Sequence, residues 1–302
     1  MPAMLGQVAC FVLDTRSETC SSFRMADTFG TGILAGKVAF VAGGTRGMNL
    51  AIARRCAEQG AKVAVLSRNK ERVDAAVAEL EAIGGEVRGY NADVREYDDL
   101  EAALTSAAEE LGPLDIVVAG QAGNFYAPAL GMSSNGFKAV VDIDLVGTFN
   151  VFRASHALLR KPGATLIAIT APEAVRPLKF QAHVCAAKAG VNMLIKVLAL
   201  EWGPDGVRVN GISPGPIEGS WGMDNVASPT QEMKDRITQA SPLRRWGTND
   251  DIADSALFLA SDAASYITGT ILDTDGAISI SMPGAESGDG PDPRVKGPNH
   301  SS

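Results

Sequence analysis

Short apolar segments alternate with helical segments along most of this chain, and this alternation restricts the fold more than any other feature. The first strand is expected at residues 37–41 and the first helix at residues 48–59, ending at Gly60. Further strands are predicted at residues 62–66, 86–91, 115–118, 165–170, 207–212 and 270–274, and helices at residues 69–83, 97–111, 187–201 and 250–260, with a long helix or helix pair at 133–159. The pattern therefore predicts an α/β fold, a single doubly wound domain with a mostly parallel seven-stranded sheet. Its ligand site should lie at the carboxyl ends of the strands.

The two ends of the chain lack this pattern. Residues 1–33 contain three methionines and are predicted to be a poorly structured extension, with Met25 as the simplest natural start. Residues 282–302 are rich in Gly, Pro, Asp and Ser and are predicted to be a disordered tail. Their last residues, 299–302, do not form a peroxisomal signal. The folded domain is therefore expected over residues 34–281.

Composition excludes several function classes. The net charge of −8 argues against non-specific nucleic-acid binding, and no apolar run approaches the ~18 residues of a membrane span. No metal site is expected, because there are only three histidines and the cysteines lack ligand spacing; these are Cys10, Cys20, Cys56 and Cys185. We therefore expect reduced thiols, a cytoplasmic location and a small-molecule substrate. A reactive role for Cys185 is the alternative.

A glycine-rich turn joins the first strand to the first helix. It reads Gly43-Gly44-Thr45-Arg46-Gly47-Met48. Backbone N–H groups at such a helix start bind a pyrophosphate, as in Rossmann-type domains. A tight turn without a ligand is the alternative. The second strand ends in Ser67-Arg68, where an NAD-preferring domain carries a carboxylate. Arg46 and Arg68 together suit the 2′-phosphate of NADP(H), although two solvated arginines would give the same sequence.

Three motifs in this order make the chain resemble the short-chain dehydrogenase/reductase family over roughly residues 34–281. They are the turn at 43–47, Asn91-Ala-Asp93-Val94 after the third strand, and Pro214-Gly215-Pro216-Ile217 after the sixth. The resemblance implies NADP(H) as cofactor and a homotetramer. Together with the argument from the two arginines, the resemblance implies a set of cofactor-binding residues. These are Gly43, Thr45, Arg46, Gly47, Met48, Ser67, Arg68, Asp93, Val94, Gly120, Lys188, Pro214, Gly215 and Ile217. One departure is Asn49, which replaces the third glycine of the turn and should alter helix packing.

The reacting end departs further from the family pattern. The family works with Asn, Ser, Tyr and Lys, and these positions hold Asp144, Ala171, Val184 and Lys188. Carbonyl reduction by the usual tyrosine route is therefore disfavoured. One branch, the peroxisomal-type 2,4-dienoyl-CoA reductases, is similar in lacking the tyrosine. The chain resembles this branch in residues 122–125, 142–150, 183–188, 201–204 and 214–219. The resemblance implies that Asp144 and Lys188 act through a water to protonate a dienolate carbon.

The implied function is NADPH-dependent reduction of a conjugated enoyl or 2,4-dienoyl thioester, or of a related enone. The expected substrate-binding residues are Asn124, Phe125, His183 and Trp221, with residues 218–241 as a lid and Arg176, Lys179, Arg244 and Arg245 as candidates for CoA phosphates. For two of these residues there is an alternative role: Asp144 as a carboxylate that packs helices, and His183 as a packing residue. There are also two alternative functions. One is a non-redox cyclase or isomerase on the same fold, and the other is a nucleotide-binding regulatory protein without turnover.

Overall fold

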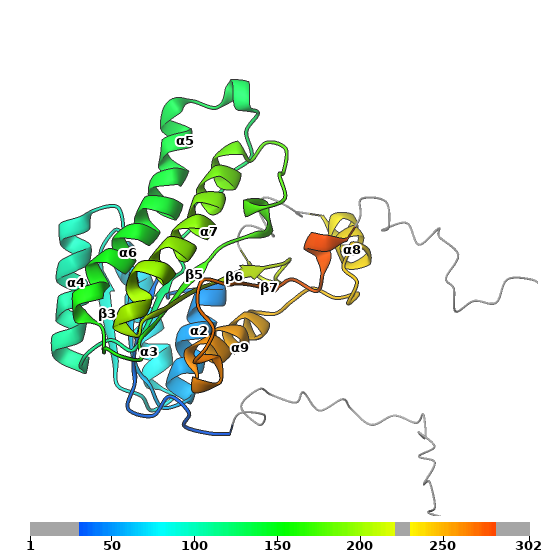
Figure 1. The fold of residues 1–302 in the computed structure, drawn as a ribbon. Helices are drawn as coiled ribbons and strands as arrows, with labels where there is room; N and C mark the ends of the chain where they lie inside the picture. The colour runs from blue at the N-terminus through cyan, green and yellow to red at the C-terminus, as the bar shows by residue number, and fades with distance from the viewer. Residues whose placement is uncertain (1–29, 221–229, 282–302) are drawn as a thin grey trace, which may run out of the picture.

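The computed structural model describes residues 30–220 and 230–281 (Figure 1). Seven strands form one sheet in the order β3-β2-β1-β4-β5-β6-β7. They are β1 (Val38–Ala42), β2 (Lys62–Ser67), β3 (Val87–Asn91), β4 (Ile116–Ala119), β5 (Thr165–Ile169), β6 (Arg208–Pro214) and β7 (Ile271–Thr274). Every neighbouring pair is parallel. The predicted doubly wound α/β fold is confirmed, and the sheet is wholly rather than mostly parallel.

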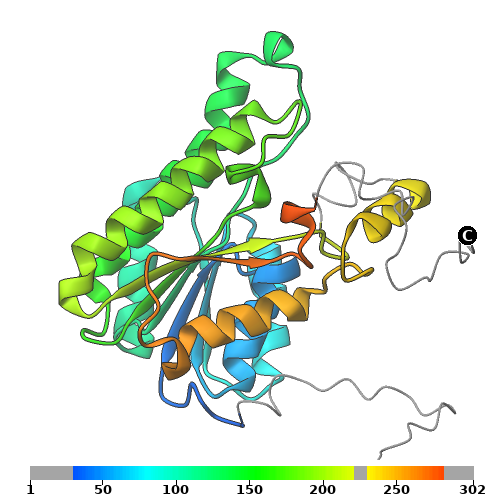
Figure 2. The ribbon, with the colours of Figure 1, turned by 45° about the vertical axis from the view of Figure 1, so that its right-hand side comes forward.

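Helices cover both faces of the sheet (Figures 1 and 2). The helices are α2 (Gly47–Glu58), α3 (Lys70–Glu81), α4 (Tyr97–Leu111), α5 (Ser134–Val141), α6 (Gly147–Ser155), α7 (Ala182–Trp202), α8 (Gln231–Ala240) and α9 (Asn249–Ala260). Short turns of 3₁₀ helix are η1 (Ala129–Gly131), η3 (His156–Leu158), η4 (Pro172–Ala174), η5 (Gly203–Asp205), η7 (Asp262–Ala264) and η8 (Ile278–Ile280). Side chains alternate across β1, so Phe40 packs with α4, α6 and α7, whereas Val41 packs with α2, α3 and α9. Two apolar cores result, one on each face.

The strand order changes direction between β1 and β4. Chain connections from these two neighbours run to opposite sides of the sheet, which leaves a crevice at their carboxyl ends. α5 and the first half of α7 extend beyond that edge on one side, and α8 with η8 stands on the other (Figure 2). The fold therefore gathers the ends of β1, β4, β5 and β6 at the predicted ligand edge.

The helical region expected at residues 133–159 is one continuous path with an irregular middle. α5 leads into a π-helical turn, η2 (Asp142–Val146), which leads into α6. Such wide turns insert an extra residue into a helix and occur often at functional sites. Asp144 lies in this turn, so a local change of helix geometry sets the direction of its side chain.

α7 is longer than the sequence predicted, because it begins at Ala182 rather than at residue 187. By length and composition alone, residues 182–205 could cross a membrane, which contradicts the expectation that no apolar run approaches that length. The helix nevertheless packs Val191 and Ile195 into the core beneath the sheet and carries the buried Lys188. A core helix of one domain accounts for these properties.

The chain already packs against the domain at residue 34, where the domain is predicted to begin. Leu34 is fully buried, and its N–H donates to Gln59 O at 3.1 Å. The predicted extension falls mainly on residues 1–29 and the predicted tail on residues 282–302, all of which lie outside the described residues.

Candidate active site

The glycine turn after β1 has the geometry that a pyrophosphate site needs. A Cβ on Gly44 would lie 2.8 Å from Val41 O, so the turn admits no larger residue there. Gly43 and Gly47 have φ of +75° and +54°, which glycine adopts without strain. A Cβ on Gly47 would meet nothing within 4 Å, so the start of α2 is open. The residues fit a bound pyrophosphate, and the predicted Thr45 and Met48 lie in the same turn.

Asn49 replaces the usual third glycine with a polar bridge between α2 and β4. Its Nδ2 donates to Gly120 O at 2.6 Å. A Cβ on Gly120 would lie 2.3 Å from Asn49 Oδ1, so a larger residue there would displace the Asn49 amide. The predicted change in helix packing is therefore a hydrogen bond that fixes the end of β4 against the cofactor turn.

Cations gather where the adenosine end of a dinucleotide would lie. Burial first, and then the charge of Arg72, lowers the pKa of Arg46. Arg72 lies in the first turn of α3, where its backbone N–H donates to the capping Asn69 side chain at 2.8 Å. Arg68 is exposed, and its Nη1 lies 3.6 Å from Asp93 Oδ2. The sequence interpretation missed Arg72, because its approach to Arg46 depends on how α3 packs beside the glycine turn.

Asp93, which is expected to contact the adenine, lies close to Arg68 and Arg95. Burial alone would raise its pKa, but hydrogen bonds from Arg95 and the charges of Arg95 and Arg68 lower it below the usual value. The next residue, Val94, is buried, and its carbonyl accepts from Asn150 Nδ2 at 2.9 Å. The Asp93 carboxylate thus stays ionised and holds Arg68 near the end of β2, where Ser67 O accepts from Asn91 Nδ2.

The segment after β6 closes over the carboxyl edge beside β7. A Cβ on Gly215 would lie 2.6 Å from Asp275 Cα, so this close approach also requires glycine. Pro214 ends β6, and Ile217 is buried where it bridges to Gly247. The structure thus places the predicted Pro214, Gly215 and Ile217 together at this edge.

Asp144 and Lys188 form a buried ion pair at the centre of the edge. Lys188 Nζ lies 3.3 Å from Asp144 Oδ2 and donates to Ile169 O at 2.9 Å. Asp144 Oδ1 accepts from Gly123 N–H at 2.7 Å. Asp144 Oδ2 makes no hydrogen bond to any described residue. A buried carboxylate oxygen that lies beside an ammonium group and accepts no hydrogen bond is able to hold a water or a substrate atom.

The positions that carry serine and tyrosine in the family are apolar. Val184 is buried on α7 one turn before Lys188, and Ala171 follows β5. Thr170 is the nearest hydroxyl in sequence, but it donates to Asn192 Oδ1 at 2.6 Å. The Asp144–Lys188 ion pair is therefore the charged pair that η2 and α7 bring to this centre.

The loop after β4 brings the expected substrate residues to the same place. Phe125 packs against His183, with ring centroids 4.2 Å apart. Asn124 Oδ1 accepts from Gln181 Nε2 at 3.0 Å. Sequence reasoning missed Gln181, because nothing in a single sequence joins two side chains so far apart along the chain. Trp221 lies outside the described residues.

His183 is fully buried, and neither ring nitrogen makes a hydrogen bond of normal geometry to a described residue. Burial lowers its pKa, which the Phe125 backbone and the Asp144 charge only partly oppose. The ring is therefore neutral at pH 7. It packs against one side of Phe125, and a Cβ on Gly136 of α5 would lie 3.5 Å from Phe125 Cζ.

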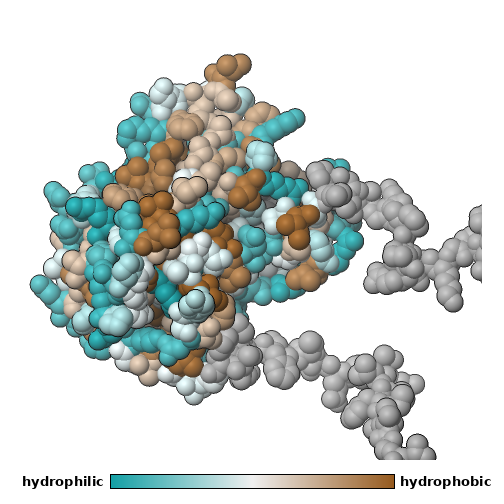
Figure 3. Space-filling model, in the orientation of Figure 1, coloured by the Kyte–Doolittle hydropathy of each residue, from teal (hydrophilic) through white to brown (hydrophobic). Residues whose placement is uncertain are grey.

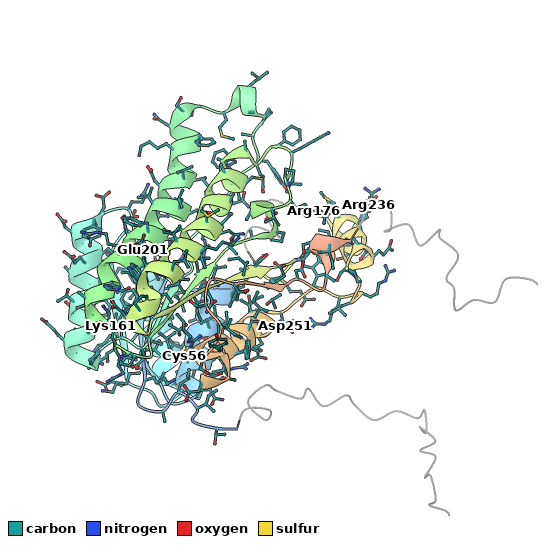
Figure 4. All side chains as sticks on the ribbon, in the orientation of Figure 1. Cys56, Lys161, Arg176, Glu201, Arg236 and Asp251 are labelled. Carbon is teal, nitrogen blue, oxygen red and sulfur yellow. The ribbon has the colours of Figure 1, made fainter. Side chains whose placement is uncertain are left out.

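Most of the cations suggested for CoA phosphates have partners within the chain. Arg176 points from the segment after β5 toward η8, where its Nη1 donates to Ile278 O at 2.6 Å (Figure 4). Arg245 forms a two-point contact with Asp251, at 2.7 and 3.0 Å, and Arg244 donates to Gln239 O. Lys179 is exposed.

The sequence of residues 42–279 matches the family model described as enoyl-(acyl carrier protein) reductase. The chain belongs to the short-chain dehydrogenase/reductase family. This confirms the resemblance read from the motifs, and the match runs from the last residue of β1 through β7. Asn49, Ala171 and Val184 are then departures within the short-chain dehydrogenase/reductase family rather than signs of another fold.

Several relatives of known name are similar over most of their length. A peroxisomal 2,4-dienoyl-CoA reductase [(3E)-enoyl-CoA-producing] from Arabidopsis thaliana is 37% identical over 269 residues, covering 86% of this chain and 90% of the relative. The protein of the same name from Pongo abelii is 40% identical over 253 residues, covering 83% and 86%. A crystal structure of a short-chain dehydrogenase from Bacillus anthracis has a TM-score of 0.72 and 36% identity, covering 80% of this chain and 96% of that chain. These likenesses show that the short-chain dehydrogenase/reductase scaffold is retained over the matched part of the chain.

Proposed function

We propose that this protein reduces a conjugated 2,4-dienoyl thioester with NADPH and that Asp144 and Lys188 carry the protonation step. The supporting observation is the buried ion pair in a site whose family tyrosine is Val184. The relatives named 2,4-dienoyl-CoA reductase support the substrate class. A related enone or a simple enoyl thioester fits the same chemistry.

The cofactor proposal rests on the turn and the arginines. When bound, a reduced nicotinamide supplies a hydride. The open start of α2 would bind the pyrophosphate, and Arg46, Arg68 and Arg72 would bind the 2′-phosphate. An ammonium group has three N–H donors. With one on Ile169 O and one toward Asp144, Lys188 keeps a donor for the nicotinamide ribose.

The substrate chemistry follows from conjugation. Hydride addition at C5 of the dienoyl group moves charge to the thioester oxygen and leaves a C3–C4 double bond. A hydrogen-bond donor near that oxygen stabilises the dienolate. Asn124 can supply one, since Gln181 already engages its Oδ1 and its NH₂ group is left to donate. A water held between Asp144 Oδ2 and Lys188 Nζ would then give its proton to C2, and solvent would replace that proton. The product is a 3-enoyl thioester.

A panel of thioesters tests this function. NADPH oxidation is followed by absorbance with 2,4-dienoyl-CoA and 2-enoyl-CoA substrates of several chain lengths. Turnover of the dienoyl compounds, with a 3-enoyl product by NMR, is expected. Isomerised product without NADPH oxidation would instead indicate a non-redox isomerase. NADPH binding without turnover of any thioester would indicate a nucleotide-binding protein.

We also propose that the protein is a homotetramer in the cytoplasm. The outward faces of α6 and α7 carry apolar side chains, which appear brown in Figure 3. Leu200 is 80% and Met193 58% exposed on α7, and Phe149 is exposed on α6. A second copy of this chain would cover them, in keeping with the expected homotetramer. A cytoplasmic location is supported by the free thiols of Cys56 and Cys185, and a fluorescent fusion would test it.

A further inference from the structure

Two hydrogen bonds join the start of α7 to the loop after β4. Gln181 Nε2 donates to Asn124 Oδ1 at 3.0 Å across 57 residues of sequence. Ala127 N–H donates to Phe180 O, also at 3.0 Å. Residues 180–181 thereby hold both ends of the short segment that contains Asn124.

The Gln181 side chain has no local role in starting α7. The Gln181 carbonyl accepts from Cys185 N–H at 2.9 Å, as the residue before a helix does, but its side chain makes no capping hydrogen bond. The residue is only 2% exposed, and its Oε1 has no partner among the described residues. A buried oxygen without a partner is unfavourable for folding. Neither helix initiation nor stability therefore explains a glutamine here.

The residue before Gln181 is strained. Phe180 has φ of +69°, a conformation that bulky residues rarely adopt. Strain of this kind is unfavourable and persists where surrounding contacts fix the chain, often at active sites. The Phe180 carbonyl bond to Ala127 is such a contact.

These contacts close a ring around the site. Asp144 Oδ1 holds Gly123 N–H, and the next residue is Asn124. Asn124 is held by Gln181, which precedes α7. Lys188 of the same helix returns to Asp144. The position of the Asn124 amide is thus tied to the position of the ion pair through one rigid helix.

We propose that Gln181 is a positioning residue that aims the Asn124 amide at the thioester oxygen of the substrate. This inference rests on the proposed function of the site. Because Gln181 engages the Asn124 oxygen, the Asn124 NH₂ group is presented as a donor in one orientation. This hydrogen bond therefore favours the orientation of the Asn124 amide in which its NH₂ group can stabilise developing negative charge.

The test is a double-mutant cycle with 2,4-hexadienoyl-CoA and NADPH. Gln181→Leu should lower kcat and kcat/KM together, about tenfold, the value of one neutral hydrogen bond of ~1.4 kcal/mol. KM and the Kd for NADPH should change little. Asn124→Ala should lose at least as much. Adding Gln181→Leu to Asn124→Ala should then cause no further loss, because the two residues act as one unit.

A matched control separates positioning from packing. Gln59 is also buried, 1% exposed, and its Oε1 accepts from Ile33 N–H at 3.3 Å, where α2 ends. Gln59→Leu should reduce stability and leave kcat/KM unchanged. If Gln181→Leu does not fold, Gln181→Glu preserves the size, removes the donor when ionised and should show the same loss.

Two results would overturn this inference while leaving the proposed function intact. One is wild-type kcat/KM in both Gln181 variants, and the other is independent, additive losses in the double-mutant cycle. If the wild-type protein turns over no dienoyl or enoyl thioester, the proposed function fails and the inference falls with it.

Discussion

Lys188 Nζ lies 3.3 Å from Asp144 Oδ2, and both side chains are buried. Removing one partner would leave the other as an uncompensated buried charge, which destabilises a protein by about 3–5 kcal/mol. Gly123 N–H also depends on Asp144 as its acceptor, at 2.7 Å. The pair therefore joins helix η2, helix α7 and the loop after β4, and any variant must separate loss of chemistry from loss of fold.

Cofactor preference should follow the arginines at the end of β2. We expect NADPH to bind more tightly than NADH, and Arg68→Ala to weaken NADPH binding by roughly ten- to a hundredfold, the ~1.5–3 kcal/mol of one charged phosphate contact. Binding of NADH should barely change. Titration by nicotinamide fluorescence measures both constants. Arg236→Ala on α8, whose ion pair with Glu232 is exposed, is the control. Equal Kd values for the two cofactors would contradict this assignment.

Stability should depend on pH through His183. Its folded-state pKa is lowered by burial from the usual 6.5, so the unfolded chain binds more protons just below that pH. The resulting stability is present above about pH 6.5 and is lost as pH falls toward the folded pKa. Urea unfolding at pH 7.5 and 5.5 should show a smaller pH effect in His183→Phe than in the wild type. His156, whose pKa is also lowered, first by burial and then by Lys161, requires a parallel His156→Gln control. An unchanged pH slope in His183→Phe would refute the prediction.

Assembly can be tested at the apolar faces of α6 and α7. Light scattering at micromolar concentration should give the mass of a homotetramer. Leu200→Asp places a charge on the face expected to be covered and should shift the mass to smaller species. Leu130→Asp, on the fully exposed η1, should not. A monomeric wild-type protein would rule out this assembly.

The general architecture was predictable because each segment carries its own signal. The buried run 37–41 and the glycine turn after it identify β1 and α2 without reference to the rest of the chain. Asp144 and Lys188 were predictable by position within the family pattern. Their contact of 3.3 Å needed the folded chain, because the two residues come from different helices.

The missed features depend on geometry that local sequence does not encode. The π-helical turn at Asp142–Val146 continues the apolar pattern of its neighbours, so periodicity does not distinguish it from an ordinary helix. α8 lies in a segment where only a lid was expected, since its apolar positions are few. Gln181 was missed because its partner, Asn124, is distant in sequence.

Restoring the family tyrosine should not restore a faster enzyme. Val184 is buried within the site, so a tyrosine there would crowd the space beside Lys188 that the proposed water needs. We expect Val184→Tyr to leave dienoyl thioester reduction unchanged or lower. Steady-state kinetics on every active thioester provides the measurement. A roughly tenfold rise, equal to ~1.4 kcal/mol in the barrier, would show that the site still works by the tyrosine route.

The most direct test of the central claim is the turnover of Asp144→Asn on a 2,4-dienoyl thioester, with the Kd for NADPH measured in parallel. The amide preserves the size and the acceptor for Gly123 N–H but removes the charge that holds Lys188 and the water. Asp115→Asn is the control, because that buried carboxylate pairs with Arg160 away from the site. Turnover of Asp144→Asn should fall by ~10²–10⁴ with NADPH binding nearly intact. Lys188→Ala should impair both turnover and NADPH binding. Wild-type turnover in Asp144→Asn would contradict the account.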